Sequence, residues 1–319
     1  MLGELNQEQI RKTAIILGIP DEFIKKDYFV TKAIQALINV DNDYFELIFQ
    51  GGTSLSKGYQ IISRLSEDID FRVNLKPKSK QLGKESRRKQ LRKFRHSLVD
   101  ALEASGFIIP KASIKVFYEG RFMSIGAEFE DAKAIQYLKP HIAIECFVGE
   151  AALAPTVNHI STLIKDLLKD ECEHIKFPVK CVAVDETAAE KWVALTRRVA
   201  NTQLKSRRSD KHLVRHLYDL YHLNTKSLLT GAYLEIAHNI IEKDRIQFQK
   251  ANLSYAEDPI NVSKAAIELL SANNIWRQHW DNFLTQMVYE KNKPSFDDAY
   301  QNLLMMSDKI FREVELGVV

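Results

Sequence analysis

The chain has 319 residues, which is enough for one large domain or two ordinary ones. Its contents of 45% hydrophobic and 27% charged residues are those of a soluble globular protein. No apolar run approaches the ~20 residues that a membrane-spanning helix needs, and the segment MLGELNQEQIRK lacks the layout of a secretory signal. The composition therefore argues against a membrane protein and predicts a cytoplasmic one.

The three cysteines show neither metal-ligand spacing nor the even count of a disulfide framework. We expect Cys146, Cys172 and Cys181 to be small core residues in a reducing compartment.

The first half of the chain alternates predicted helices and strands. Apolar residues at helical spacing predict a helix after Pro20, with Asp21 as its cap. The segment FELIF at 45–49 predicts a buried strand that ends at a glycine pair, and a helix follows from about Ser54. The next predicted elements are the strand Asp68–Val73, the helix Glu85–Ala104, which Gly106 ends, and the strands Ser113–Tyr118, Met123–Phe129, His141–Phe147 and Val179–Val184.

From Thr187 onward nearly all of the chain has helical period. We therefore expect an α+β protein, with a mixed-sheet domain over residues 1–185 and an all-helical domain over residues 186–319. The predicted helices are Ala188–Ala200, Lys211–Leu223, Tyr233–Glu242, Lys264–Leu269, Asn274–Met287 and Phe296–Val314.

Candidate chemistry concentrates in the stretch FQGGTSLSKGYQIISRLSEDIDF, residues 49–71. In a strand Asp68 and Asp70 lie on one face and Ile69 on the other. Two carboxylates so close repel each other unless a divalent cation lies between them. The turn Gly51–Ser54 offers backbone amides to a phosphate. Although a bare Asp-x-Asp is common on strand edges, the combination favours nucleotide chemistry.

Other site chemistries have weaker support. His212 and His216 have a spacing that can bind zinc, but no glutamate follows His212 as a zincin motif requires. A nucleophile elbow and a lysine at P-loop spacing are both absent.

Motifs over more than half of the chain resemble those of one family. They are GGTSLSK at 51–57, RLSEDIDF at 64–71, EKWVAL at 190–195 and RHLYDL at 215–220, with KDY at 26–28 near the N-terminus. In this order they resemble the AbiEii/AbiGii-type nucleotidyltransferase toxins of the DNA polymerase β-like superfamily. The resemblance implies a nucleotidyltransferase-like mixed-sheet domain with flanking helices, followed by a helical domain.

The resemblance also implies roles for individual residues. Asp68 and Asp70 would hold Mg²⁺ or Mn²⁺, and Asp68, Asp70, Lys191 and Asp219 would form the catalytic set. The NTP would contact Gly51, Gly52, Thr53, Ser54, Lys57, Ser66 and Lys191.

Three of these assignments have alternatives. Glu145 is the candidate third metal ligand, but it is equally well explained as an edge-strand surface glutamate, and Glu128 and Glu130 compete with it. On helical spacing alone Lys191 is a lysine whose stem covers Trp192. Asp219 is equally a residue that pairs with Arg215 at i,i+4. In the same motif the chain departs from the common family form, because His216 stands where the family commonly has a second aspartate.

An RNA acceptor suits the distribution of charge. The net charge is only +3, but residues 76–95 hold ten Lys/Arg and one acid, Glu85, and a second basic cluster spans Lys205–Arg215. Such patches favour a polyanion partner, although solvated basic helix faces are common. The candidate RNA contacts are Arg87, Arg88, Lys89, Arg92, Arg207 and Arg208.

The predicted activity is transfer of a nucleoside monophosphate from an NTP to an acceptor hydroxyl, with release of pyrophosphate. The family resemblance favours a tRNA or RNA 3′ end as acceptor, and a toxin with a cognate antitoxin of the AbiEi type. Alternatives are transfer to a small molecule or a protein hydroxyl, and an inactive module that binds nucleotide or RNA. The resemblance also predicts an active site between the two domains.

Overall fold

The structure, a computed structural model, describes residues 5–66, 68–130, 139–169, 176–204, 210–226, 228–250 and 252–316. The chain divides into two compact units, Met1–Val182 (unit 1) and Ala183–Val319 (unit 2). The boundary lies within a few residues of the division expected at residue 185. The described residues form a mixed sheet with helices, followed by a helical unit, so the predicted α+β fold is confirmed.

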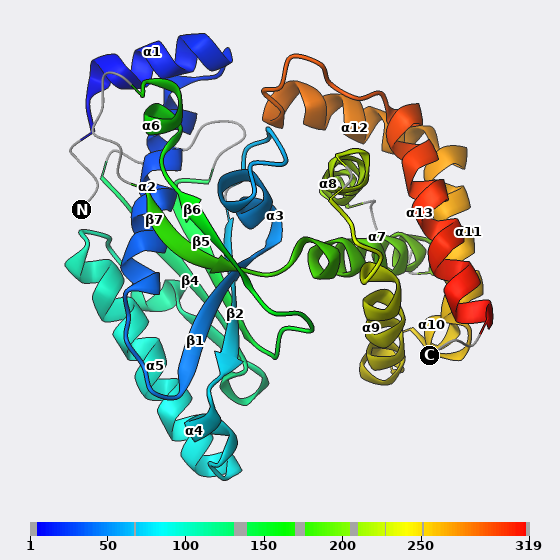
Figure 1. The fold of residues 1–319 in the computed structure, drawn as a ribbon, viewed down its shortest axis with the longest axis horizontal. Coiled ribbons are helices and arrows are strands. Elements are labelled where there is room, and N and C mark those ends of the chain that lie inside the picture. The colour runs from blue at the N-terminus through cyan, green and yellow to red at the C-terminus, as the bar shows by residue number, and fades with distance from the viewer. Residues whose placement is uncertain are drawn as a thin grey trace. The chain divides into compact units, whose positions relative to one another are not determined.

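The described part of unit 1 is built on a seven-stranded sheet in the order β3-β4-β5-β2-β1-β7-β6 (Figure 1). The central strand β2 pairs antiparallel with β1 and parallel with β5, and β1 also pairs parallel with β7. The pairs β3–β4, β4–β5 and β6–β7 are antiparallel. The strands are β1 (Phe45–Gln50), β2 (Asp68–Leu75), β3 (Lys115–Phe117), β4 (Phe122–Glu128), β5 (His141–Val148), β6 (Thr156–Ile160) and β7 (Phe177–Cys181).

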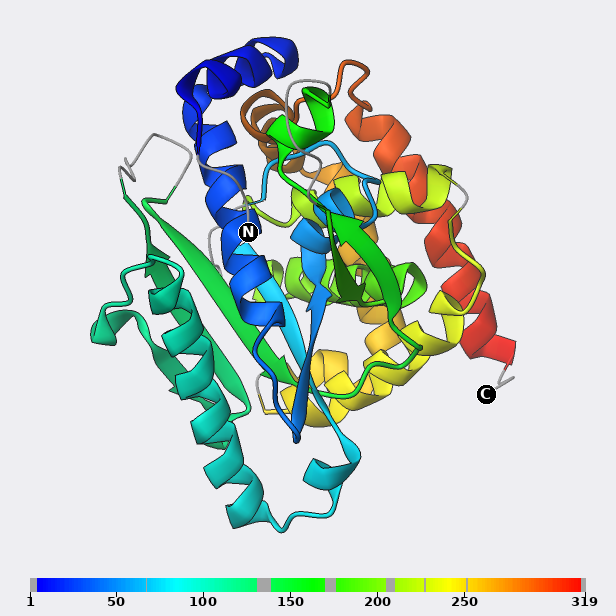
Figure 2. The ribbon, with the colours of Figure 1, turned by 60° about the vertical axis from the view of Figure 1, so that its left-hand side comes forward.

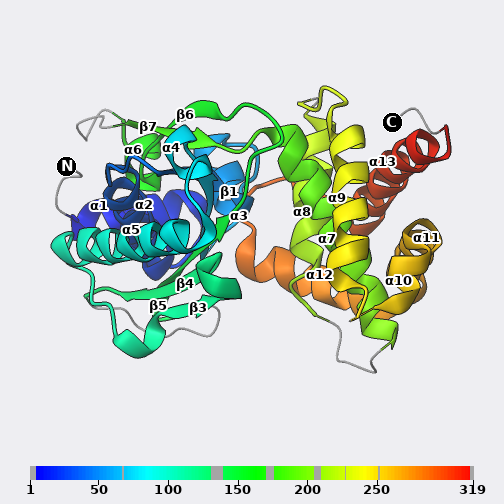
Figure 3. The same cartoon turned by 90° about the horizontal axis from the view of Figure 1, so that it is seen from below.

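Two long helices, α2 (Asp21–Ile38) and α5 (Lys84–Ala104), cover one face of this sheet (Figure 3). Both are amphipathic, and their apolar stripes join the strands in one core. The stripe of α2 is Phe23, Val30, Ala33, Ile34 and Leu37, all of them buried as predicted. Helix α1 (Gln7–Leu17) lies across the start of α2 (Figure 2), and the short helices α4 (Pro77–Lys80) and α6 (Leu163–Leu167) complete the unit.

The elements that the structure describes in unit 2 are helices joined by loops. Its first helix, α7, packs against α8, α9 and α11, which explains why Trp192 and Leu195 are fully buried. The N-terminus of α9 is capped by the buried Asp185, which accepts hydrogen bonds from the backbone N–H groups of Thr230, Gly231 and Tyr233. The helices are α7 (Val184–Leu204), α8 (Val214–Thr225), α9 (Tyr233–Phe248), α10 (Leu253–Glu257), α11 (Pro259–Ala272), α12 (Asn274–Met287) and α13 (Phe296–Leu316).

Several predicted elements differ from the structure at their ends. Pro20, not Asp21, holds the cap position of α2, because Asp21 is already helical. Ser113 belongs to a 3₁₀ turn rather than to a strand, and Val184 begins α7 rather than ending β7. Strand β6 was not expected from the sequence, because its residues 156–159 stay largely exposed and so lack a clear apolar alternation.

The described cysteines, Cys146 and Cys181, are free and buried in the unit 1 core, while Cys172 lies outside the described residues. Across the part of the chain that the structure describes, no helix has both the length and the apolar character needed to cross a membrane.

Candidate active site

The glycine pair forms a tight turn between β1 and the next segment. Helix α3 (Gly51–Thr53) begins where β1 ends and continues into a π-helical turn, Ser54–Gly58. Gly51 has φ +79°, a conformation that side chains rarely adopt, and a Cβ there would collide with the carboxylate of Asp70. A Cβ on Gly52 would collide with the guanidinium of Arg64. Each glycine therefore lies against a charged side chain that would have to move to admit a Cβ.

The Asp-x-Asp motif lies on β2 with the predicted alternation. Ile69 is fully buried in the core, whereas Asp68 and Asp70 are partly exposed on the opposite face. The parallel register of β2 and β5 pairs Asp70 with Glu145, which places the Glu145 side chain on the same face. Three acidic residues thus occupy one face of two adjacent strands.

The electrostatics of this face reflect crowding of negative charge. Burial raises the pKa of Glu145, and the charge of Asp68 raises it further, while Lys139 opposes the shift. Burial is also the main cause that raises the pKa of the Cys146 thiol to about 12, with Asp70 and Glu145 adding to it. A cation would relieve this repulsion.

One oxygen of the site is buried without a hydrogen bond. Asp68 Oδ1 accepts no hydrogen bond, and Lys139 Nζ lies 3.5 Å from it. No cluster of three His, Cys, Asp or Glu side chains in the described ranges is arranged to hold a metal ion. Mg²⁺, however, is usually bound by one or two carboxylates together with substrate phosphates and water. The donor set of Asp68 and Asp70 therefore fits Mg²⁺ held jointly with a triphosphate.

Hydroxyl groups tie the glycine turn to β2. The Thr53 hydroxyl donates to the Asp68 carbonyl. The hydroxyl oxygen of Ser66 lies 2.6 Å from the hydroxyl oxygen of Thr53. Ser54 is fully buried and its hydroxyl is near the thiol of Cys181. Of these three predicted nucleotide contacts, Ser66 is partly exposed. Thr53 and Ser54 are buried on the protein side of the turn, and their contact with a nucleotide stays a prediction.

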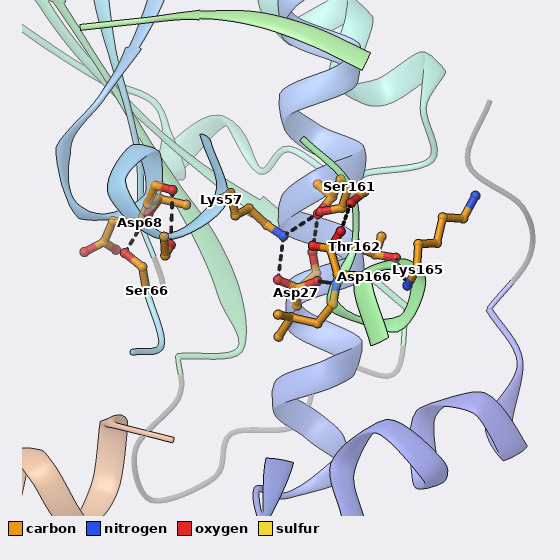
Figure 4. Close-up of polar contacts among 12 residues, drawn as sticks. Asp27, Lys57, Ser66, Asp68, Ser161, Thr162, Lys165 and Asp166 are labelled. Atoms are coloured by element: carbon orange, nitrogen blue, oxygen red, sulfur yellow. Dashed lines mark hydrogen bonds and ion pairs between the residues drawn. The ribbon is translucent and has the colours of Figure 1, made fainter. Parts of the chain in front are cut away.

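The lysine that follows the glycine turn faces another element. Lys57 is buried, and its ammonium lies 2.5 Å from Asp27 Oδ1 and 3.1 Å from the Ser161 carbonyl (Figure 4). Asp27 also accepts a hydrogen bond from the backbone N–H of Leu163. Lys57 thereby joins the turn to α2 and to the segment after β6, on the far side from Asp68. This contact gives Lys57 a structural role, and its contact with an NTP stays a prediction.

The two predicted residues of unit 2 contact each other. Lys191 Nζ on α7 lies 2.7 Å from Asp219 Oδ2 on α8. The side chains are 9% and 0% exposed, so the pair is buried. Lys191 therefore does not simply extend over Trp192 toward solvent. The parts that Lys191 and Asp219 play in catalysis stay predictions, as does a site between the units.

The competing carboxylates and the basic residues can also be placed. Glu128 is exposed at the far end of β4, opposite His141, and Glu130 is exposed beyond that strand. Glu145 therefore lies nearest to Asp70 in register. The candidate RNA contacts Arg88, Lys89 and Arg92 are exposed on α5, Arg87 donates to the carbonyls of Ser79 and Leu82, and Arg207 and Arg208 lie outside the described residues.

Sequence reasoning missed three side chains of the site. Arg64, which is 5% exposed, packs its guanidinium against Gly52, Lys139 stands beside Asp68, and Asp27 holds Lys57. Arg64 and Asp27 lie inside the quoted motifs, but Lys139 carries no sequence signal, since only the pairing of β5 with β2 brings it near.

Comparison with known proteins identifies the class. Residues 36–302 match the family described as "Nucleotidyl transferase AbiEii toxin, Type IV TA system". Since the match spans most of the chain, the protein is a nucleotidyltransferase. It belongs to the AbiEii toxin family of type IV toxin–antitoxin systems, as the motifs predicted.

Among solved structures, the nucleotidyltransferase toxin MenT4 from Mycobacterium tuberculosis matches over 98% of this chain and 99% of its own, with 15% identity and a TM-score of 0.49. No curated protein matches the sequence.

Proposed function

We propose that the protein transfers a nucleoside monophosphate from an NTP to a hydroxyl group of RNA, with tRNA as the acceptor. The acceptor oxygen forms a bond to the α-phosphorus, the bond from that phosphorus to the pyrophosphate oxygen breaks, and the hydroxyl proton is lost to solvent. The observation that carries the proposal is the carboxylate face of β2, where Asp68 and Asp70 lie beside a glycine turn whose Gly51 packs directly against Asp70.

Each residue of unit 1 has a defined part in this proposal. Asp68 and Asp70 would hold Mg²⁺ or Mn²⁺, and Glu145 is the proposed third ligand because it is the register partner of Asp70. The bound ion would supply charge neutralisation at the triphosphate and at the leaving pyrophosphate. Gly51 and Gly52 let the backbone come close to the phosphates, and Arg64 adds a positive charge behind Gly52.

In unit 2 we propose that Lys191 contacts the triphosphate and that Asp219 orients the Lys191 side chain. The 2.7 Å contact between them supports the second part, because a fixed ammonium costs less entropy to place than a mobile one. The proposed charge of Lys191 would act on the phosphates as a point cation.

The toxin class implies an antitoxin partner, and we propose one of the AbiEi type. We further propose that the protein acts in the cytoplasm, where NTPs and tRNA are present. Induction of the wild-type gene should arrest growth, and co-expression of the adjacent reading frame should restore it. Arrest that persists with every neighbouring gene would contradict this assignment.

The activity is tested with purified protein, Mg²⁺, each α-labelled NTP and total tRNA. We expect label in RNA with wild type and a loss of about a thousandfold or more in Asp68→Asn and Asp70→Asn, since metal-assisted charge stabilisation contributes several kcal/mol. The matched control is Glu128→Gln, an exposed carboxylate on a neighbouring strand, which should retain full activity. Wild type that labels no RNA, or an active Asp70→Asn variant, would refute the proposal.

The third ligand is tested by the same assay. Glu145→Gln should lower activity and raise the Mg²⁺ concentration needed for half-maximal rate, whereas Glu128→Gln should change neither. Equal effects of the two variants would remove Glu145 from the metal site.

A further inference from the structure

A hollow in unit 1 lies at the edge of the sheet, between α5 and the turn that follows β3. It has a volume of about 640 Å³, within the range of ligand pockets. Its lining includes Arg88, Arg92 and Arg95 from α5, and Phe117 and Tyr118 from the end of β3. We call this hollow the α5 pocket.

Three guanidinium groups line the α5 pocket from one helix. Arg88, Arg92 and Arg95 are spaced i, i+4 and i+7, so they share a face of α5. Together they span about 10 Å along the helix axis. Burial lowers the pKa of Arg95, and the charges of Arg92 and Arg88 lower it further. Burial and mutual repulsion therefore disfavour the charged guanidinium groups in the pocket, and a bound anion would offset this free-energy cost.

Arg95 supplies an independent sign of a missing anion. Its Nη1 atom is buried and has no hydrogen-bond partner. It lies close against Gly120, where a Cβ would come within 2.7 Å of it, and Gly120 has φ +89°. A buried charged donor without an acceptor is costly unless a ligand supplies one.

The acids of the pocket do not neutralise these cations. Glu85 and Glu119 line it beside Arg88, Lys89, Arg92 and Arg95, which gives four positive charges against two negative ones. Glu119 is also paired with Lys84 at 2.9 Å.

The aromatic side chains of the pocket indicate which polyanion it takes. Tyr118 is 74% exposed and Phe117 is 49% exposed. Large exposed rings beside guanidinium groups suit a ligand that combines phosphates with unpaired bases, since bases stack on aromatic rings and phosphates bind arginine. The arginine row is therefore long enough to contact more than one phosphate of a strand. Neither an acidic peptide nor a free phosphate uses both features.

The pocket is also connected to the carboxylate face. Phe117 is the register partner of Phe122, which pairs with Phe147, so three phenylalanines cross from β3 to β5 on one face. Their row ends at Arg72 on β2, two residues beyond Asp70. Three strand spacings of about 4.8 Å give about 14 Å between β3 and β2, a distance that a few nucleotides of a single strand can span.

We infer that the α5 pocket binds the RNA acceptor, with phosphates at Arg88, Arg92 and Arg95 and a base stacked on Phe117 or Tyr118. The bound segment lies a few nucleotides from the hydroxyl that is modified. This inference rests on the proposed function for the identity of the ligand and extends it to a second site on unit 1.

The test measures binding of a 5′-labelled single-stranded RNA of about twelve nucleotides by fluorescence anisotropy, without NTP and without Mg²⁺. The double variant Arg88→Gln/Arg92→Gln should weaken binding about tenfold or more and lower the salt slope by about 1.4, because each single-strand phosphate contact contributes about 0.7. Arg95→Gln should weaken it similarly. The matched control Lys93→Gln removes an exposed charge from α5 outside the pocket and should bind within about twofold of wild type.

The stacking part has its own variants. Tyr118→Ala combined with Phe117→Ala should lose about tenfold in affinity, and Tyr118→Phe should bind as wild type because the ring remains. Melting curves of each variant establish that the fold is retained.

Three results would overturn the inference. The first is wild-type affinity for RNA in the arginine variants, and the second is an equal loss of RNA affinity in Lys93→Gln. The third is unchanged RNA affinity in pocket variants that bind an acidic peptide or the antitoxin less tightly. Label transfer separates this failure from that of the proposed function. If wild type labels RNA and the pocket variants keep the same KM for RNA, the pocket is wrong and the function stands. If RNA binding depends on the pocket but no RNA is labelled, the proposed activity is wrong and the pocket stands.

Discussion

The acidic residues of the two units differ in what surrounds them. In unit 2, Asp185 accepts hydrogen bonds from the N-terminus of α9, Asp219 pairs with Lys191, and Glu290 accepts a hydrogen bond from Tyr218 at 2.7 Å. In unit 1, Asp68 keeps a buried oxygen without a hydrogen bond, and burial and negative charge raise the pKa of Glu145. These three acids of unit 2 are satisfied within the protein, whereas Asp68 and Glu145 of unit 1 are not fully compensated by their neighbours.

This difference separates stability from chemistry. Removing a satisfied buried acid leaves its partners without a counter-charge, which is costly. Removing one of two crowded carboxylates relieves repulsion and costs the fold little. The acids of unit 2 should therefore be needed for stability, while those of β2 should be needed for activity.

The largest effect on stability is expected from the Lys191–Asp219 pair. Asp219→Asn should lower the free energy of unfolding by about 3–5 kcal/mol, because it leaves the ammonium of Lys191 buried without its counter-charge. The matched control is Asp210→Asn, which removes the acid of a partly exposed pair with Arg198 and should cost at most about 1 kcal/mol. Denaturant unfolding of the full chain measures both.

A double variant separates the two roles of Lys191. Lys191→Met/Asp219→Leu replaces both charges by apolar groups and should regain most of the lost stability. If Lys191 contacts the triphosphate, this variant is stable and inactive. If it is stable and active, Lys191 serves only the packing of α7 on α8. Asp219 would then serve stability alone, as Asp185 and Glu290 do.

The carboxylate face was predictable from local sequence. Alternation of side chains on a strand is a property of the backbone, so the placement of Asp68 and Asp70 opposite Ile69 followed once β2 was recognised. The pattern IAIECF likewise placed Glu145 opposite Ile144 and Cys146, as the burial of these two residues bears out.

Partners that come from distant segments were not predictable. Lys57 follows the glycine turn as a phosphate-binding lysine would, yet its ammonium is held by Asp27, thirty positions earlier. Lys139 reaches Asp68 only because β5 pairs with β2. Helical spacing alone made Lys191 a lysine whose stem covers Trp192, but the packing of α8 on α7 buries it against Asp219. A single sequence carries the period of each element, but not which elements become neighbours.

The next effect concerns the glycine turn, and it compares two glycines with the same strain. Gly51 (φ +79°) and Gly18 (φ +65°) both adopt the left-handed conformation, but a Cβ on Gly18 meets nothing within 4 Å, while one on Gly51 meets Asp70. Each alanine substitution should cost about 1 kcal/mol or more from strain. Only Gly51→Ala should also abolish label transfer, because it displaces the carboxylate of Asp70. Equal activity of the two variants would show that the position of Asp70 is not critical.

A further effect is expected at Glu290, and it depends on pH. Burial alone would raise the pKa of Glu290, but the hydrogen bonds from His222 and Tyr218 outweigh burial and lower it. A lowered pKa means that the folded state favours the ionised carboxylate. The stabilisation is therefore complete above the usual pKa of a glutamate, and it is lost as the pH falls through the lowered value.

Glu290→Gln should accordingly reduce the free energy of unfolding by about 1–2 kcal/mol at neutral pH, because its hydrogen bonds no longer involve a charge. The difference from wild type should shrink as the pH is lowered through the range where Glu290 protonates. Thermal unfolding at a series of pH values measures it, with the exposed Glu268→Gln as control. A difference that stays constant with pH would mean that the shape of the Glu290 side chain matters rather than its charge. The hydrogen bonds of Glu290 would then stabilise unit 2 without any contribution from its charge.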